Sequence, residues 1–171
     1  MKKLINDPNN IVRELFEGFH AMHKETVDLL DDANVVVKRD LKEERVTLLI
    51  GGGSGHEPLF LEFIGEGLAD AVCQGNIFAA PSPDAILKAT EAVHRGKGVL
   101  YVYGNYAGDN LNFDMAAELA EAIGIRTETV RVMDDVASGT PDNIEERRGT
   151  AGDLFVIKVA GATCSSGLDL D

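Results

Sequence analysis

The stretch that decides the fold runs from Val46 to Pro58 and reads VTLLIGGGSGHEP. Its first five residues are apolar or β-branched, a pattern that predicts a short buried strand in a parallel sheet. The glycines and Ser54 that follow predict a tight loop whose bare N–H groups face an oxygen-rich ligand. Pro58 is typical of the first turn of a helix. His56 is therefore expected at the carboxyl end of a strand, where open α/β sheets bind ligands.

This loop does not fit three well-known glycine motifs, and each of them fails at His56. A dinucleotide-binding fingerprint requires glycine where His56 stands, at the sixth position from Gly51. A Walker A loop ends in Gly-Lys-Ser/Thr, whereas this loop ends in His-Glu-Pro. A nucleophile elbow centred on Ser54 requires glycine two residues later. A purely structural turn with a surface histidine stays open as the alternative.

The composition is that of a soluble globular chain with an excess of acidic groups. The 171 residues include 29 acidic and 16 basic side chains, so the formal net charge is −13. Since no basic patch stands out, we expect neither nucleic acid nor an anionic membrane as a partner. Cys73 and Cys164 form no disulfide framework and no metal-ligand spacing, and we expect no bound metal. Without a recognisable secretory leader or membrane span, we expect a cytoplasmic protein.

The rest of the chain alternates strands with amphipathic helices. Strands are expected at residues 35–37, 46–50, 72–78, 98–103 and 127–133, and helices at residues 11–22, 59–71, from the Ser82 cap to 93, after Asp109 to 123, and 151–163. The last segment is β-branched enough to fit a strand, but its length favours a helix. Asp134 and Asp135 are expected in a turn or helix cap rather than in catalysis. This order predicts one α/β domain over residues 1–171, with three layers: a mostly parallel sheet with helices on both faces.

Two of the expected strands end in glycine loops, and right-handed crossovers place both loops at the carboxyl edge of the sheet. His56 and Asp109 are therefore expected to face each other across a crevice. A small polyol or hydroxyketone fits such a site, because the backbone N–H groups of Gly53, Ser54 and Gly55 can donate to it and Asp109 and a neutral His56 can accept from it. His56 can take the proton of a hydroxyl that is being phosphorylated, with Asp109 orienting the hydroxyl or the imidazole. An Asx turn is the alternative for Asp109.

The motifs resemble those of a known family. The residues that carry the resemblance are the loop 51–58, the run Asn105-Tyr106-Ala107-Gly108-Asp109, Leu111-Asn112-Phe113 and Arg147-Arg148-Gly149. Together they resemble the substrate-binding subunit of dihydroxyacetone kinase over nearly the whole chain. The resemblance implies that the domain binds dihydroxyacetone or another short ketose and presents its hydroxyl for phosphorylation. It implies catalytic roles for His56 and Asp109, and substrate binding by Gly53, Ser54, Gly55, His56 and Asp109.

The resemblance also implies partners. It predicts no cofactor in this chain, but ATP or ADP with Mg²⁺ on a separate nucleotide-binding kinase subunit. In the bacterial systems that use phosphoenolpyruvate, a further phosphotransferase protein recharges that nucleotide. A homodimer is compatible with the family. A ligand-sensing coactivator, also found among such relatives, is the alternative function; a dinucleotide-dependent oxidoreductase is disfavoured by His56.

The sequence departs from the family at two points. The family commonly has a substrate-contacting lysine before Asn-Tyr, where this chain has Gly104. This makes a four-carbon ketose such as erythrulose an alternative substrate. The second half of family members contributes a histidine that binds the ketone carbon covalently, and none of the four histidines here matches it: His20, His23, His56 and His94. We therefore expect this chain to correspond to the first half of the family's subunit.

Overall fold

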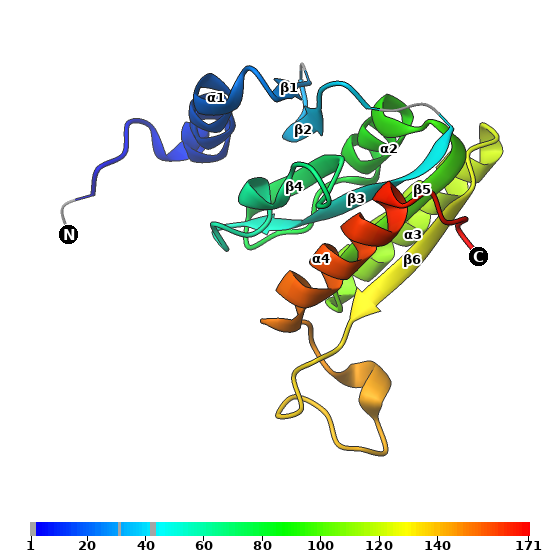
Figure 1. Cartoon of the computed structure of the whole chain (residues 1–171). Coiled ribbons are helices and arrows are strands. Elements are labelled where there is room, and N and C mark those ends of the chain that lie inside the picture. Colours follow the sequence, from blue (N-terminus) through cyan, green and yellow to red (C-terminus); the bar gives the residue numbers. More distant parts are fainter. Residues whose placement is uncertain (1–2, 31, 42–43) are drawn as a thin grey trace.

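The computed structural model describes residues 3–30, 32–41 and 44–171 and shows a six-stranded sheet between two layers of helices (Figure 1). The strands are β1 Val27–Leu29, β2 Val35–Lys38, β3 Arg45–Ser54, β4 Ala71–Ile77, β5 Gly96–Gly104 and β6 Thr127–Val132, in the order β1-β2-β4-β3-β5-β6. The helices are α1 Ile11–His23, α2 Pro83–Val93, α3 Ala107–Ala122 and α4 Gly152–Ser165, with 3₁₀ turns at Pro8–Asn10, Leu61–Phe63 and Ile144–Glu146.

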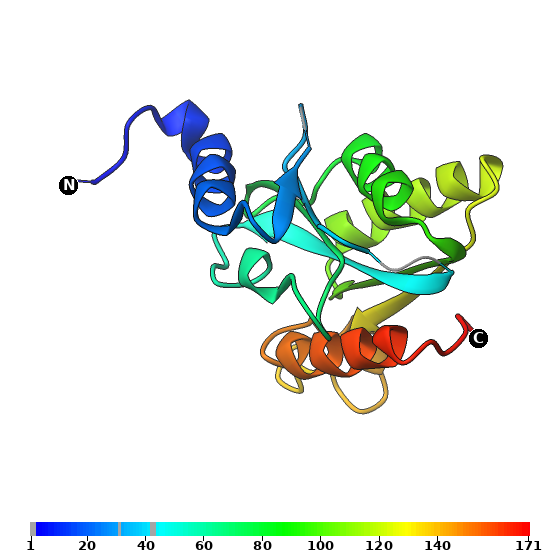
Figure 2. The ribbon, with the colours of Figure 1, turned by 45° about the horizontal axis from the view of Figure 1, so that its top comes forward.

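The sheet is mostly parallel, as the sequence predicted. Strand β3 pairs in parallel with both β4 and β5, and β5 pairs in parallel with β6. The short strands β1 and β2 pair antiparallel at the other edge, and β1 was not predicted. Figure 2 shows α4 covering one face of the sheet and α2 and α3 covering the other. The three-layer α/β class is confirmed.

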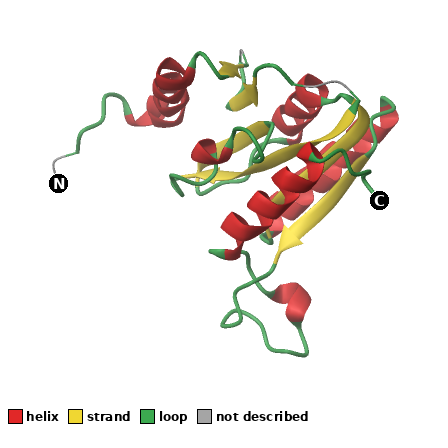
Figure 3. Cartoon of the chain, in the orientation of Figure 1, coloured by secondary structure: helices red, strands yellow, loops and turns green. Residues whose placement is uncertain are grey.

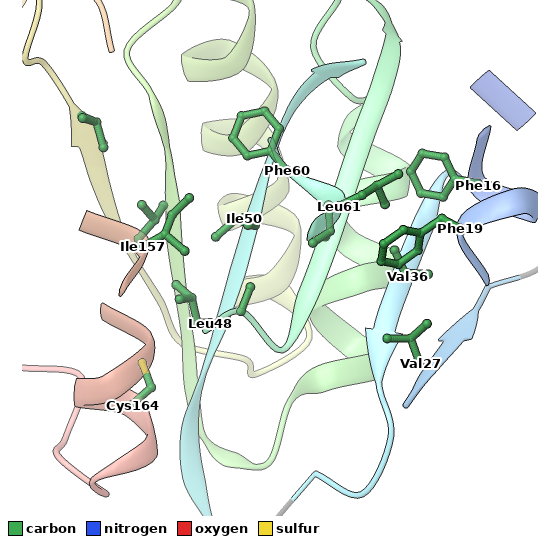
Figure 4. Close-up of a cluster of buried hydrophobic side chains, with 14 of the residues drawn as sticks. Phe16, Phe19, Val27, Val36, Leu48, Ile50, Phe60, Leu61, Ile157 and Cys164 are labelled. Atoms are coloured by element: carbon green, nitrogen blue, oxygen red, sulfur yellow. The ribbon is translucent and has the colours of Figure 1, made fainter. Parts of the chain in front are cut away.

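Alternate residues of β3 divide the core between the two faces. Leu48 and Ile50 pack in a first cluster, which also holds side chains from α1, α4 and the segment after β3 (Figure 4). Leu49, between them in sequence, packs in a second cluster with Ile86 of α2 and Phe113 of α3. Because successive side chains of a strand point to opposite faces, one central strand serves both clusters. All ten residues of β3 are buried.

The prediction of a loop at Gly51–Gly53 is wrong, because β3 continues through these glycines to Ser54. Both faces of the strand are crowded here: a Cβ on Gly51 would meet the carbonyl oxygen of Cys73, and one on Gly52, on the opposite face, would meet the ring of Phe60. A Cβ on Gly53 would lie 2.8 Å from the backbone nitrogen of Ala79. Glycine is therefore required at these positions because other segments of the chain pack directly against the strand backbone, and not because the chain turns here.

The prediction of a helix at 59–71 is also wrong. This segment contains turns, the 3₁₀ turn Leu61–Phe63 and an isolated bridge between Ile64 and Ala69, and β4 already begins at Ala71. Gly65 and Gly67 adopt positive φ of 154° and 65°, which a helix does not contain. The apolar spacing still buries Phe60 and Leu61 in the first cluster.

The other expected helices and strands are present, with small shifts at their ends. Ser82 caps α2 by accepting a hydrogen bond from the N–H of Ala85 at 3.3 Å. Residues 152–165 form a helix, so the prediction based on the length of this segment is confirmed over the strand that its β-branched residues also fit. Strand β6 is an edge strand, in which exposed residues alternate with partly buried ones up to Arg131. Within the described ranges, none of the helices combines the length and the apolar character that crossing a membrane requires.

Candidate functional site

A cavity of about 820 Å³ lies at the carboxyl ends of the parallel strands. Its walls come from the segments that follow β3, β4, β5 and β6, together with the last residues of β3 and β5; they are residues 51–53, 56, 59–60, 78–80, 104, 106–109, 149–151 and 153. The longest of these segments joins β6 to α4 and forms the large loop at the foot of Figure 3. The cavity therefore occupies the edge of the sheet that the sequence predicted.

The cavity opens between β3 and β5 because the chain leaves these neighbouring strands toward opposite faces. The segment after β3 buries Phe60 and Leu61 in the first cluster. Helix α3, after β5, buries Phe113 in the second cluster. Two adjacent parallel strands whose connections diverge in this way form the crevice where open α/β sheets bind ligands.

His56 and Asp109 both line this cavity, so the structure brings together the two residues expected to act on a substrate. The His56 side chain is exposed, and its ring meets that of Phe78 edge-on, with centroids 5.0 Å apart and an interplanar angle of 60°. Gly53 lines the same wall. A histidine, a carboxyl group and a strand end with backbone N–H groups thus surround one space.

Ser54 and Gly55 are not among the described residues that line the cavity, contrary to expectation. Ser54 is 1% exposed, and its hydroxyl donates a hydrogen bond to the carbonyl of Gly75 at 2.8 Å. The N–H of Gly55 donates to the Glu57 carboxylate at 3.0 and 3.2 Å. The Ser54 hydroxyl and the Gly55 N–H are therefore already satisfied within the chain. Of the three expected donors, only Gly53 borders the cavity.

Asp109 lies in the first turn of α3, because the helix begins at Ala107 rather than after a longer glycine loop. Asp109 is half-buried, and its Oδ1, which has almost no accessible surface, has no hydrogen-bond partner in the structure. Burial raises the pKa of Asp109 to about 6, and a backbone hydrogen bond lowers it by less. The Asp109 carboxyl group can therefore form a hydrogen bond with a ligand in the cavity.

Asp153 is a second buried carboxyl group on the cavity wall, and sequence reasoning missed it. It lies in the first turn of α4 and is 5% exposed, and its Oδ1 has no partner. Burial raises the pKa of Asp153 to about 7, helped by repulsion from Asp134 and Asp109. An acidic residue in the first turn of an apolar helix is ordinary, so the sequence held no signal that set it apart.

Asp134 holds the start of α4 against the cavity. Its carboxylate accepts hydrogen bonds from the Thr150 N–H at 2.7 Å, the Thr150 hydroxyl at 2.9 Å and the Gly152 N–H at 2.8 Å. Burial raises the pKa of Asp134, but these hydrogen bonds lower it by more, so the net shift is downward. Asp134 thus binds the start of α4 from another segment, which fits the turn or helix-cap chemistry expected of it.

The Asn-Tyr pair of the second motif fixes the loop before α4. The Asn105 amide donates to the carbonyls of Glu145 at 2.9 Å and Arg147 at 2.7 Å. The Tyr106 hydroxyl donates to the carbonyl of Gly149 at 3.0 Å. These bonds hold residues 149–153 against the end of β5.

Among the residues that the structure describes, no group of three or more His, Cys, Asp or Glu side chains is arranged to hold a metal ion.

An open α/β sheet with a crevice of this kind defines a small-molecule-binding α/β domain. A family model described as "Dak1 domain" matches residues 17–171. The chain belongs to the Dak1 domain family, which confirms the resemblance inferred from the motifs.

Known relatives agree with this assignment. The "PTS-dependent dihydroxyacetone kinase 2, dihydroxyacetone-binding subunit DhaK" of Listeria innocua is 50% identical over 173 residues, covering 100% of this chain and 52% of that protein. The "L-erythrulose kinase" of Pectobacterium atrosepticum is 42% identical, covering 99% and 29% respectively. The solved dihydroxyacetone kinase from C. freundii, in complex with AMP-PNP and Mg²⁺, superposes with a TM-score of 0.90 at 38% identity, covering 99% of this chain and 32% of that one. The chain thus spans about half, or less, of the length of these relatives.

Proposed function

We propose that this chain is the ketose-binding domain of a short-ketose kinase of the dihydroxyacetone kinase type. It presents a substrate hydroxyl to a phosphoryl group delivered from another subunit or domain. The observation that carries the proposal is the cavity that joins His56, Asp109 and the Gly53 strand end at the carboxyl edge of the sheet. The kinase names of the relatives support the same class of substrate.

Each side of the cavity has a role in this reaction. The hydroxyl oxygen of the ketose attacks phosphorus while its proton passes to the imidazole of His56. Asp109 orients that hydroxyl or the imidazole, and the Gly53 N–H donates to the carbonyl oxygen of the ketose. ATP with Mg²⁺, held by the partner, would supply the γ-phosphoryl group, and ADP would be the leaving group; where phosphoenolpyruvate is the ultimate donor, that ADP would be the form that is recharged. The chain's own contribution is to hold the ketose and to take the proton.

The partners follow from the same proposal. They are a ketose, a nucleotide-binding kinase subunit or domain, and, where phosphoenolpyruvate is the ultimate donor, a phosphotransferase protein. The words "PTS-dependent" in the name of the Listeria relative support the last of these. A homodimer and a cytoplasmic location belong to the proposal as predictions. The coactivator alternative is not favoured, because the relatives reported above are named as kinases or kinase subunits.

Replacing His56 by alanine in the complete enzyme tests the proposal. We expect turnover to fall at least ~100-fold, the usual scale for losing a general base. Substrate affinity should change much less, because His56 is one of several contacts. The matched control is His94→Ala, since His94 lies at the end of α2 and does not line the cavity. Near-normal turnover of His56→Ala with both dihydroxyacetone and erythrulose would remove His56 from the role.

A further inference from the structure

One group on the cavity wall has no part in the proposed reaction. Asp153 is 5% exposed and lines the cavity, yet its Oδ1 has no hydrogen-bond partner. Buried polar groups in native proteins are nearly always paired, so an unpaired one calls for an explanation. Leaving a buried carboxyl group unpaired costs free energy that an apolar residue would not cost. Because Oδ1 itself has almost no accessible surface, a ligand would hydrogen-bond this carboxyl group through Oδ2, the oxygen that lies next to Gly104.

Gly104 leaves the Asp153 carboxyl group open to the cavity. A Cβ at position 104 would lie 3.2 Å from Asp153 Oδ2 and 3.3 Å from a ring carbon of Tyr106, so a side chain there would crowd the carboxyl group. Among the described residues that line the cavity, none is Lys or Arg. The charged groups that act on the Asp153 carboxyl group are Asp134 and Asp109, which carry the same sign of charge. A neutral hydroxyl suits this position, because it can donate to a carboxylate or accept from a neutral carboxyl group.

The number of polar partners indicates which hydroxyl. Gly53 can bind the carbonyl of a ketose, and His56 and Asp109 both act at the hydroxyl that is phosphorylated, which leaves Asp153 for a further hydroxyl. Dihydroxyacetone has one further hydroxyl, on a carbon next to the carbonyl. A four-carbon ketose such as erythrulose has two. The four-carbon ketose can therefore offer Asp153 a hydroxyl that dihydroxyacetone lacks.

We propose that Asp153 determines substrate specificity by hydrogen-bonding the additional hydroxyl of a four-carbon ketose, in the space that Gly104 leaves open. This inference rests on the proposed function, because it assigns the substrate of the same site. It makes Asp153 a substrate-contacting residue and Gly104 the residue that gives the substrate access to it. Dihydroxyacetone, which has no such hydroxyl, is expected to depend less on Asp153.

The test is the ratio of kcat/KM for erythrulose to kcat/KM for dihydroxyacetone in the complete enzyme. We expect the wild type to prefer erythrulose and Asp153→Ala to lower the ratio about tenfold, which corresponds to about 1.4 kcal/mol and lies near the range for a hydrogen bond to a charged group. Activity on dihydroxyacetone should fall by less than activity on erythrulose does. The matched control is Asp84→Ala, since Asp84 holds the same position in the first turn of α2 and does not line the cavity.

Two further variants keep the test decisive. Asp153→Leu has nearly the shape of aspartate without polar atoms, so it reports on specificity even where the alanine variant is poorly folded, and it should lower the ratio as alanine does. Gly104→Ala keeps Asp153 but crowds its carboxyl group, and should lower the ratio in the same direction. An unchanged ratio in Asp153→Leu, or a wild type that phosphorylates only dihydroxyacetone, would overturn this inference and leave the proposed function standing. A wild type that phosphorylates neither ketose would overturn the proposed function itself.

Discussion

The carboxyl groups of Asp109 and Asp153 make the stability of the domain depend on pH in an unusual direction. Burial raises the pKa of Asp109 to about 6 and, with repulsion from Asp134 and Asp109, that of Asp153 to about 7, against an ordinary value of 3.8. Each group therefore keeps its proton in the folded state at pH values where the unfolded chain has lost it. Their contribution to stability is fully present below about pH 4 and is lost as pH rises through 6 and 7.

We expect Asp153→Asn to be more stable than the wild type at pH 8, by roughly 1–2 kcal/mol, and to lose this advantage at pH 5. Asparagine keeps the shape of the side chain but cannot ionise. Urea denaturation of both proteins at the two pH values measures the difference. Comparing the variant with the wild type removes the contribution of carboxylates that lie far from Asp153, because effects of distant groups add independently. An equal difference at both pH values would contradict the raised pKa.

A substitution at Gly52 is expected to destabilise the domain. A methyl group there would overlap the ring of Phe60, with one ring carbon only 2.6 Å away, and Phe60 is 5% exposed in the first cluster. We expect Gly52→Ala to lower the free energy of unfolding by about 1–3 kcal/mol, the usual range for an overpacked core.

Gly18→Ala is the matched control for Gly52. Gly18 lies within α1 with nothing within 4 Å of its missing Cβ. Alanine is a better helix former than glycine, so this change should raise the free energy of unfolding by up to about 1 kcal/mol. Chemical denaturation measures both variants, and effects of the same sign would show that crowding at Phe60 is not the cause.

At the scale of elements, the start of α4 depends on one side chain from another segment. Asp134 follows β6 and accepts three hydrogen bonds from Thr150 and Gly152. We expect Asp134→Ala to lower the free energy of unfolding by about 1–2 kcal/mol, as for loss of a helix cap. Hydrogen exchange should rise most at the first turn of α4. Asp142→Ala, an exposed acidic residue of the same loop, is the control and should change little. Unchanged exchange at α4 in Asp134→Ala would contradict this role.

The local sequence pattern was sufficient to predict helices and strands whose buried residues recur with the period of the element itself. An amphipathic pattern predicted α1, and the Ser82 cap predicted the start of α2. The same reasoning failed where distant residues decide the conformation. Gly51 and Gly52 lie in a strand because Cys73 and Phe60 approach them closely, and neither approach is visible in the local sequence.

The same limit applies to the candidate site. His56 and Asp109 follow apolar strands with glycine-rich ends, so the topology rules for parallel sheets were enough to bring them to one edge. Asp153 belongs to the same cavity only because the loop between β6 and α4 is bound to Asn105 and Tyr106. No rule based on neighbouring residues places the start of α4 beside Gly104.

For the whole molecule, we predict that this chain alone folds and holds its ketose weakly. Both core clusters share one sheet, which supports folding as one unit. Hydrogen bonds from the cavity contribute about 0.5–1.5 kcal/mol each, or more where charged. Set against the immobilisation of a small ligand, they should leave the dissociation constant near the millimolar range, about −4 kcal/mol. NMR titration with dihydroxyacetone and erythrulose, with intact-mass spectrometry, is the measurement. A micromolar constant or a covalent adduct would contradict the prediction.

The hydrogen bonds of Asn105 have a consequence for how this chain can vary through evolution. The amide binds the carbonyl oxygens of Glu145 and Arg147, and Tyr106 binds that of Gly149. Every amino acid supplies a carbonyl oxygen, so mutations at 145 and 147 leave these bonds intact, whereas a Cβ at 149 would collide with the backbone of Gly104. The loop can therefore vary in sequence at 145 while the cavity wall keeps its position, whereas the Arg147 side chain is also held by donating to the carbonyl of Gly139 at 3.0 Å. Selection should instead fall on Asn105, Tyr106 and Gly149.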